Sequence, residues 1–192
     1  MTHSDQLAFD KKKIDTILVL DFGSQYTQLI ARRIRELGVF SIILPWDISK
    51  ERILEINPTG IILSGGPESV TNNNTPRIPE IIFGLDIPIL GICYGMQTLA
   101  EQFGGQVTAS KTKEFGHASI TLEQASILFD GFDVGSLVDV WMSHGDHVSS
   151  LPDQFLLIAS TPSAPIAAMV HSKKPIYALQ FHPEVTHTKE GS

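Results

Sequence analysis

The first half of the sequence alternates short, uninterrupted apolar runs with segments whose apolar residues recur at helical spacing. Strands that are apolar throughout are buried on both faces, which is typical of a parallel sheet covered by helices on either side. We therefore expect an α/β fold with a mainly parallel open sheet, whose functional groups lie at the carboxyl ends of its strands. The expected strands are TILVLDFG (16–23), FSIIL (40–44), GIILS (60–64) and IPIL (87–90), and the expected helices cover residues 26–37, 50–56 and 94–103.

The second half changes to strand signals separated by turns. These segments predict a small antiparallel annex, from which the last strand returns to the main sheet. Before them, the turn-rich stretch VTNNNTPRIP (70–79) is expected to be an exposed loop. The expected annex strands are HASITL (117–122), LVDVWMS (137–143), FLLIAS (155–160), IAAMV (166–170) and IYALQF (176–181).

Composition limits the class of protein. With 192 residues, of which 42% are hydrophobic, the chain is expected to form one domain over residues 16–192, preceded by a polar lead-in at 1–15. A net charge of -7 argues against partners such as nucleic acid or an anionic membrane. No apolar run approaches the roughly 20 residues of a membrane span, and the single cysteine cannot form an internal disulfide. We therefore expect a cytoplasmic location.

The only cysteine, Cys93, lies in GICYG between Gly91 and Gly95. Glycines two residues on either side of a nucleophile are typical of a sharp turn from a strand into a helix, where backbone segments approach closely. The free N–H groups and the positive dipole end of the following helix would favour a thiolate. A buried cysteine that acts as a small hydrophobe is the alternative interpretation, and GICYG alone does not decide between them.

A cysteine nucleophile needs a base, and His182 in LQFHPEV is the strongest candidate. Glu184 follows two residues later, so in extended chain both side chains project to the same side. Glu184 would orient one ring nitrogen of His182 while the other faces Cys93. Alone, the HPE stretch would equally fit a turn with surface side chains, and the predicted elbow at Cys93 favours the catalytic interpretation.

Two further polar segments follow predicted strands. SGGPES (64–69) has glycines whose backbone N–H groups can approach an oxyanion, although an ordinary glycine turn is the alternative. WMSHGDHV (141–148) holds His144, Asp146 and His147, whose closeness suggests a metal site. We expect no metal, because no further cysteine or carboxylate accompanies them at ligand spacing.

Together, GICYGMQ, SGGPES, MSHGD and QFHPEVTHT resemble the class I (triad-type) glutamine amidotransferase domains, in the form found in GMP synthases. The stretch DFGSQYTQLIARRIRELGV resembles the opening of the same domains, so the resemblance runs from about Thr16 to Thr188. It implies Cys93 as the nucleophile, His182 as the base and Glu184 as its orienter. It also implies an oxyanion hole and a glutamine pocket, formed respectively by Gly66 and Tyr94 and by Gln97, Ser143, Gly145 and Asp146.

The resemblance implies that glutamine is hydrolysed through a cysteine thioester, with no cofactor in this domain. The ammonia would pass to an ATP pyrophosphatase (synthetase) domain that uses ATP and Mg²⁺ to convert XMP to GMP, in a full-length enzyme that forms a homodimer. We find no phosphate-binding loop of that kind here, so we expect an excised domain rather than a free-standing protein. An amidotransferase of another pathway and a non-catalytic binding module are the alternatives.

Overall fold

The computed structural model describes residues 14–191, without the side chains of residues 110–112. The predicted lead-in (1–15) therefore lies almost entirely outside the described residues. Within the described part, no helix combines the length and the apolar character needed to cross a membrane.

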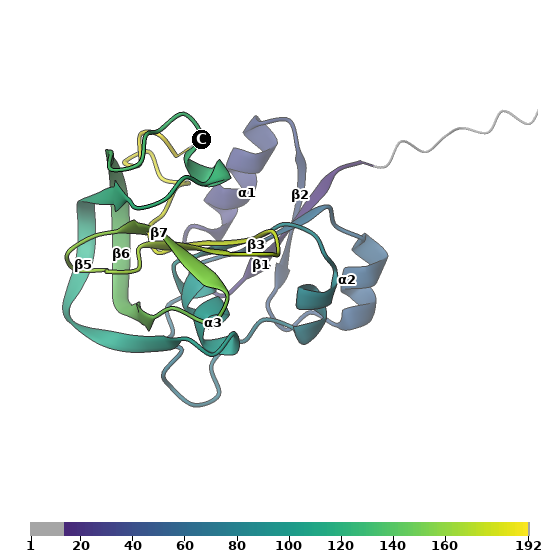
Figure 1. Ribbon diagram of the computed structural model, residues 1–192. Helices are drawn as coiled ribbons and strands as arrows, with labels where there is room; N and C mark the ends of the chain where they lie inside the picture. The colour runs from purple at the N-terminus through teal and green to yellow at the C-terminus, as the bar shows by residue number, and fades with distance from the viewer. Residues whose placement is uncertain (1–13, 192) are drawn as a thin grey trace, which may run out of the picture.

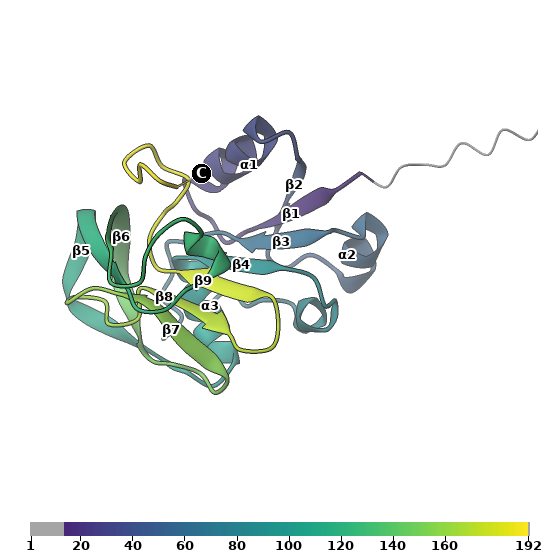
Figure 2. The same ribbon diagram turned by 45° about the horizontal axis from the view of Figure 1, so that its top comes forward.

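In residues 14–191, nine strands form one sheet in the order β2-β1-β3-β4-β9-β8-β7-β5-β6 (Figures 1 and 2). The strands from β2 to β9 in this order pair in parallel, and those from β9 to β6 pair antiparallel. The predicted α/β fold and the return of the last strand to the parallel sheet are thus confirmed. The strands are β1 (Thr16–Asp21), β2 (Phe40–Pro45), β3 (Gly60–Leu63), β4 (Ile89–Ile92), β5 (Gln106–Leu122), β6 (Leu137–Ser150), β7 (Phe155–Ser160), β8 (Ala168–His171) and β9 (Ile176–Leu179).

Helices cover both faces of the parallel part, as its continuous apolar strands predict. Alternate residues of β1 point to opposite faces: Val19 packs with Ile30 of α1, whereas Leu20 belongs to the core that includes Ile53 of α2 and Leu99 of α3. Figure 2 shows α1 on one side of the sheet and α3 on the other. The helices are α1 (Thr27–Glu36), α2 (Lys50–Ile56) and α3 (Tyr94–Gln102), with short 3₁₀ turns η1 (Glu80–Gly84) and η2 (Ile127–Phe129).

The two ends of α2 show how the local sequence determines where a helix begins and ends. The Ser49 hydroxyl accepts a hydrogen bond from the Arg52 N–H and so caps the helix start. At the other end, Asn57 adopts a left-handed conformation with φ of 48°, and Pro58 follows it. The predicted bounds of this helix, residues 50–56, match the structure.

The antiparallel part is a continuation of the main sheet rather than a separate annex. β5 and β6, with 17 and 14 residues, are much longer than the segments 117–122 and 137–143 predicted for them. They curl toward β9, and the N–H of His182, just after β9, donates a 3.0 Å hydrogen bond to the carbonyl of Trp141 in β6. This curl brings β6, at the far edge of the strand order, back beside the parallel strands (Figure 2).

The prediction of an exposed loop at residues 70–79 is wrong for its two ends. Val70 and Ile78 are 1% and 2% exposed and belong to the main core. The Gln102 side chain also bonds both the N–H and the carbonyl of Ile78, at 2.9 and 3.0 Å. Only the tip around residues 71–74 is exposed. Because turn-forming residues dominate this stretch, the sequence analysis did not recognise Val70 and Ile78 at its ends as core residues.

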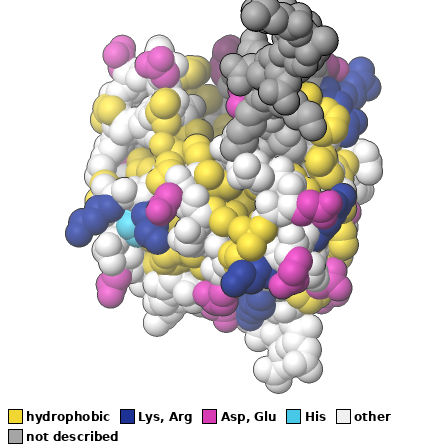
Figure 3. Space-filling view, turned by 90° about the vertical axis from the view of Figure 1, so that its right-hand side faces the viewer, with side chains coloured by type: hydrophobic (Ala, Val, Ile, Leu, Met, Phe, Trp, Pro, Cys, Tyr) yellow, Lys and Arg dark blue, Asp and Glu magenta, His cyan; other side chains and the backbone are white. Residues whose placement is uncertain are grey.

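The face that carries α2 mixes acidic and basic side chains around small hydrophobic patches (Figure 3). The functional segments lie elsewhere, at the carboxyl ends of the parallel strands. The chain after β1 supplies Tyr26, the chain after β3 supplies Gly66, and Cys93 and His182 follow β4 and β9. The parallel topology therefore gathers at one edge the segments that the sequence singles out.

Candidate active site

Cys93 occupies the turn between β4 and α3 in a strained backbone conformation, with φ of 53° and ψ of -106°. Such a conformation costs a non-glycine residue about 1–3 kcal/mol and is found mostly at functional sites. Its flanks must be glycine: a Cβ on Gly91 would lie 2.7 Å from Leu99 Cδ1, and one on Gly95 would lie 2.8 Å from Leu63 Cβ. The structure thus has the sharp elbow that the sequence predicts.

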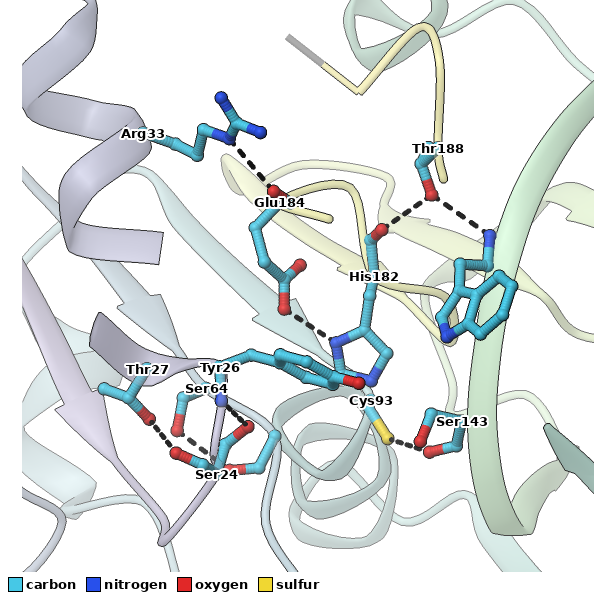
Figure 4. Close-up of polar contacts among 12 residues, drawn as sticks. Ser24, Tyr26, Thr27, Arg33, Ser64, Cys93, Ser143, His182, Glu184 and Thr188 are labelled. Atoms are coloured by element: carbon cyan, nitrogen blue, oxygen red, sulfur yellow. Dashed lines mark hydrogen bonds and ion pairs between the residues drawn. The ribbon is translucent and has the colours of Figure 1, made fainter. Parts of the chain in front are cut away.

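His182 and Glu184 form a buried pair beside Cys93 (Figure 4). Glu184 Oε1 lies 2.7 Å from His182 Nδ1, and both residues are less than 5% exposed. The opposite edge of the ring faces the Cys93 side chain (Figure 4). The structure therefore brings together the three residues predicted as nucleophile, base and orienter.

The surroundings of His182 favour its charged form. Burial opposes protonation, but hydrogen bonds to Cys93 and Glu184, reinforced by their negative charges, outweigh it and raise the pKa of His182 to about 10. An imidazolium beside the sulfur stabilises a thiolate by charge. The site thus holds a positively charged imidazole beside the sulfur of Cys93.

Three other residues hold this pair in place (Figure 4). Arg33 of α1 donates from Nε to the backbone carbonyl of Glu184 at 3.0 Å, and the Thr188 hydroxyl donates to the carbonyl of His182 at 2.7 Å. The Tyr26 ring packs edge-on against the imidazole, with 4.9 Å between centroids. The orientation of His182 is therefore fixed by packing and by backbone contacts as well as by Glu184.

Gly66 and Tyr94, the predicted oxyanion donors, lie side by side. A Cβ on Gly66 would stand 3.3 Å from Tyr94 Cγ and 2.6 Å from the Phe22 carbonyl oxygen, so no larger residue fits there. In the part of the chain that the structure describes, neither backbone N–H has a protein acceptor. Tyr94 is buried and Gly66 is half-buried, and buried N–H groups are rarely left without a partner, so these two are available to a ligand.

A cavity of about 630 Å³ opens above the elbow. A volume of this size suits a small-molecule ligand. Its walls include the predicted residues Cys93, Gly66, Gln97, Ser143, Gly145, Asp146 and His182. Tyr94 and Glu184 do not line the cavity. The Tyr94 side chain is buried in the core, so its predicted contribution is that of its backbone, and Glu184 lies behind His182.

The wall formed by MSHGD lies within β6, not after a strand as predicted. The Gln97 side-chain amide donates from Nε2 to the Asp146 carbonyl at 2.8 Å, and the Cys93 thiol lies 3.5 Å from the Ser143 carbonyl. Gln97 therefore supports the wall with its nitrogen, which leaves its Oε1 for a ligand.

Gln180 is a site residue that the sequence analysis missed. It is fully buried, and its Nε2 lies 3.8 Å from Cys93 Sγ, while its Oε1 lies 3.4 Å from Gln97 Nε2. Its position two residues before His182 was a usable signal, because the alternation that pairs His182 with Glu184 also places Gln180 on that side.

His144 also lines the cavity, and both of its ring nitrogens have polar neighbours. Its Nδ1 donates to the Asp146 carbonyl at 3.0 Å, and its Nε2 lies 3.2 Å from Glu114 Oε2. Burial lowers the pKa of His144 despite the nearby Glu114 carboxylate. Among residues 14–191, no cluster of three or more His, Cys, Asp or Glu side chains is arranged to hold a metal ion.

Comparison with known proteins places this geometry in a family. Residues 18–192 match the family described as glutamine amidotransferase class-I. The GMP synthase [glutamine-hydrolyzing] of Hahella chejuensis is 58% identical over 182 residues, or 91% of this chain and 35% of the relative. That of Teredinibacter turnerae is 59% identical over 181 residues, or 91% of this chain and 34% of the relative. The chain thus spans about a third of the length of these curated relatives.

Solved structures share the fold. A protein from Thermoplasma acidophilum, described as belonging to a GMP synthase, has a TM-score of 0.81 and 36% identity, covering 93% of this chain and 89% of its own. A glutamine amidotransferase from Thermotoga maritima has a TM-score of 0.72 and 24% identity, covering 90% of this chain and 77% of its own. The second likeness is one of fold alone.

Proposed function

Because this chain belongs to the class-I glutamine amidotransferase family, we propose that it is the glutaminase domain of a GMP synthase, which hydrolyses the side-chain amide of glutamine. The observation that carries the proposal is the contact of Cys93, on its strained elbow, with a His182 ring held 2.7 Å from Glu184. This is the arrangement of nucleophile, base and orienter that acyl transfer requires.

In the proposed first step, the Cys93 thiolate attacks the side-chain amide carbon of glutamine. The carbonyl oxygen becomes an oxyanion, which the N–H groups of Gly66 and Tyr94 would bind. Protonated His182 then gives its proton to the amide nitrogen, the C–N bond breaks, and ammonia leaves. A γ-glutamyl thioester remains on Cys93.

In the second step, neutral His182 takes a proton from water, and the hydroxide attacks the thioester carbon. The C–S bond breaks, glutamate is released, and the thiolate and imidazolium are restored. Glu184 keeps the Nδ1 proton directed toward itself throughout, so that Nε2 faces the reaction. Its role is to position the base, not to transfer a proton.

The α-amino-acid end of glutamine would lie against Gln97, Ser143, Gly145 and Asp146. The Oε1 atom of Gln97 can accept from the substrate ammonium, because only Nε2 is used in bonding Asp146 and Gln180. The substrate would thus bridge α3 and β6.

Ammonia would pass to a synthetase domain that converts XMP to GMP with ATP and Mg²⁺. The support is that the matching GMP synthases are about three times as long as the region they share with this chain. We assign the homodimer contacts of the full-length enzyme to parts outside this chain, and the reaction to the cytoplasm, whose reducing conditions preserve a free thiolate.

Two alternatives lead to different outcomes in one assay. An amidotransferase of another pathway would hydrolyse glutamine without a response to XMP, and a binding module would not hydrolyse it at all. The test measures glutamate release with and without a GMP synthetase domain, ATP and XMP, together with mass spectrometry of Cys93 under a glutamine-shaped electrophile. Glutamate release that depends on Cys93 and rises with the synthetase and XMP supports the proposal. No release and no labelling would refute it.

A further inference from the structure

The charges around the cavity are unevenly distributed. Among the described residues that line it, Lys113, in β5, is the only lysine or arginine, whereas Glu68 and Asp146 contribute carboxylates. The other cationic group, His182, is already paired with Glu184. The described lining of the cavity thus offers one uncommitted positive charge.

Lys113 is exposed and has no carboxylate partner within the described residues. The neighbouring Glu114 does not neutralise it, because strand alternation directs Glu114 to the other face. There its two oxygens meet His144 at 3.2 Å and Ser163 at 2.8 Å. No carboxylate in the described part of the chain therefore balances the charge of Lys113.

The Lys113 side chain runs over the wall of the cavity toward the predicted substrate segment. Its Cγ, Cδ and Cε atoms would lie 3.7–3.9 Å from a Cβ on Gly145, so the stem lies against the bare backbone there. Phe115, two residues along β5, also lines the cavity and is 67% exposed. This face of β5 thus forms an outer wall with a cation next to Gly145.

Glutamine carries a negative charge at one end only, and only that end can use a positively charged partner. Its amide end is neutral and goes to Cys93, whereas its other end carries a carboxylate and an ammonium. Glu68 and Asp146 cannot bind the carboxylate, since like charges repel. We propose, as an inference that rests on the proposed function, that Lys113 binds the α-carboxylate of glutamine and so selects a free α-amino acid as substrate.

We expect Lys113 to contribute only moderately to glutamine binding, because its side chain is exposed to solvent. A charge-assisted hydrogen bond is stronger than a surface ion pair, and its loss corresponds to binding that is about tenfold weaker. Because the carboxylate does not react, its contact is made equally before and during the chemical step. Loss of Lys113 should therefore weaken binding and leave the maximal rate nearly unchanged.

The test uses two chloroketone analogues of glutamine that alkylate Cys93, one with a free α-carboxylate and one with a neutral carboxamide in its place. For each, the concentration that gives half the maximal labelling rate is measured by mass spectrometry. The variants are Lys113→Ala, Lys113→Arg and Lys173→Ala. Lys173, on an exposed turn away from the cavity, is the matched control for the loss of one positive charge.

For Lys113→Ala, we expect the concentration that gives half the maximal labelling rate to rise about tenfold with the free-acid analogue. With the carboxamide analogue it should not change. Lys113→Arg and Lys173→Ala should behave like the wild type. An equal shift for both analogues, or no shift, would overturn the role of Lys113 while labelling of the wild type still supports the proposed function. If neither analogue labels wild-type Cys93, both the proposed function and the role of Lys113 would be overturned.

Discussion

The side-chain amide of Gln97 donates a 2.8 Å hydrogen bond to the backbone carbonyl of Asp146, and this bond fastens α3 to β6 across the cavity. The same oxygen accepts a 3.0 Å hydrogen bond from His144 Nδ1. The helix that begins beside the nucleophile therefore also sets the position of the opposite wall. The two halves of the site cannot move independently while this contact holds.

Replacement of Gln97 should mainly weaken substrate binding. Gln97→Ala removes both the support of the wall and the free Oε1, and we expect KM for glutamine to rise at least about tenfold with a smaller change in kcat. Gln97→Glu should be worse, because a carboxylate oxygen would face the Asp146 carbonyl. Steady-state kinetics of both variants check this. A loss of kcat at unchanged KM would show that Gln97 acts on the chemical step instead.

Cys93→Ala should abolish glutamine-dependent activity, since loss of a triad nucleophile costs several powers of ten in rate. In a whole synthetase, added ammonia should still support amination. The fold should persist, and Cys93→Gly should be more stable than Cys93→Ala by about 1 kcal/mol, because glycine tolerates a φ of 53° without strain. Urea unfolding compares the two variants. Retention of half the glutaminase rate in Cys93→Ala would contradict the mechanism.

Glu184→Gln should be less damaging than His182→Ala, because glutamine can still accept a hydrogen bond from Nδ1. It should lower the pKa of His182, now raised to about 10 in part by the Glu184 carboxylate. A raised pKa contributes stability that is complete below about pH 6.5, the unfolded value, and is lost as the pH rises toward 10. The difference in unfolding free energy between wild type and Glu184→Gln should therefore shrink from pH 7 to pH 10.

NMR titration of the His182 ring measures the same effect directly. The ring resonance should titrate near pH 10 in the wild type and at lower pH in Glu184→Gln. Identical titration in the two proteins, or greater activity loss in Glu184→Gln than in His182→Ala, would mean that the assigned roles are wrong.

Gly95→Ala should disrupt the elbow. Its Cβ would lie only 2.8 Å from Leu63 Cβ and would also collide with the backbone carbonyl of Leu63, which cannot rotate away as a side chain can. We expect a loss of more than about 3 kcal/mol in unfolding free energy and loss of Cys93 labelling. Gly84→Ala is the matched control, because a Cβ there meets nothing within 4 Å. Equal stability of the two variants would refute the packing account.

The isolated chain should be a poor glutaminase that a synthetase domain with ATP and XMP activates. The loop SGGPES, which supplies Gly66, is rich in glycine and can rest in an unproductive conformation. A shift from about 1% to mostly competent sites needs only a few kcal/mol of differential binding, which an interface between domains can supply. Glutamate production with and without the partner is the measurement. Equal rates would show that the two domains are not coupled.

The parallel half of the fold and its elbow could be predicted because their signals are local. Apolar runs, the glycines around Cys93 and the two-residue spacing of His182 and Glu184 each act over a few residues. The burial of Ile78 could not be predicted, because Gln102 reaches across from α3 to bond its backbone. Val70 joins the same core, and its carbonyl accepts a hydrogen bond from Arg77. Nor could the strand that carries Ser143 to Asp146 be predicted, whose polar residues break the alternation because they line a cavity.

The His182 N–H donates a hydrogen bond to the Trp141 carbonyl, so the hydrogen-exchange rate of this one amide proton reports on the opening of the whole site. The proton belongs to the residue proposed as the base, and its acceptor belongs to the strand that forms the opposite wall. Any opening that separates β6 from the end of β9 would expose it to solvent deuterium. Its exchange rate would therefore report how often the assembled site comes apart, without substrate, label or turnover.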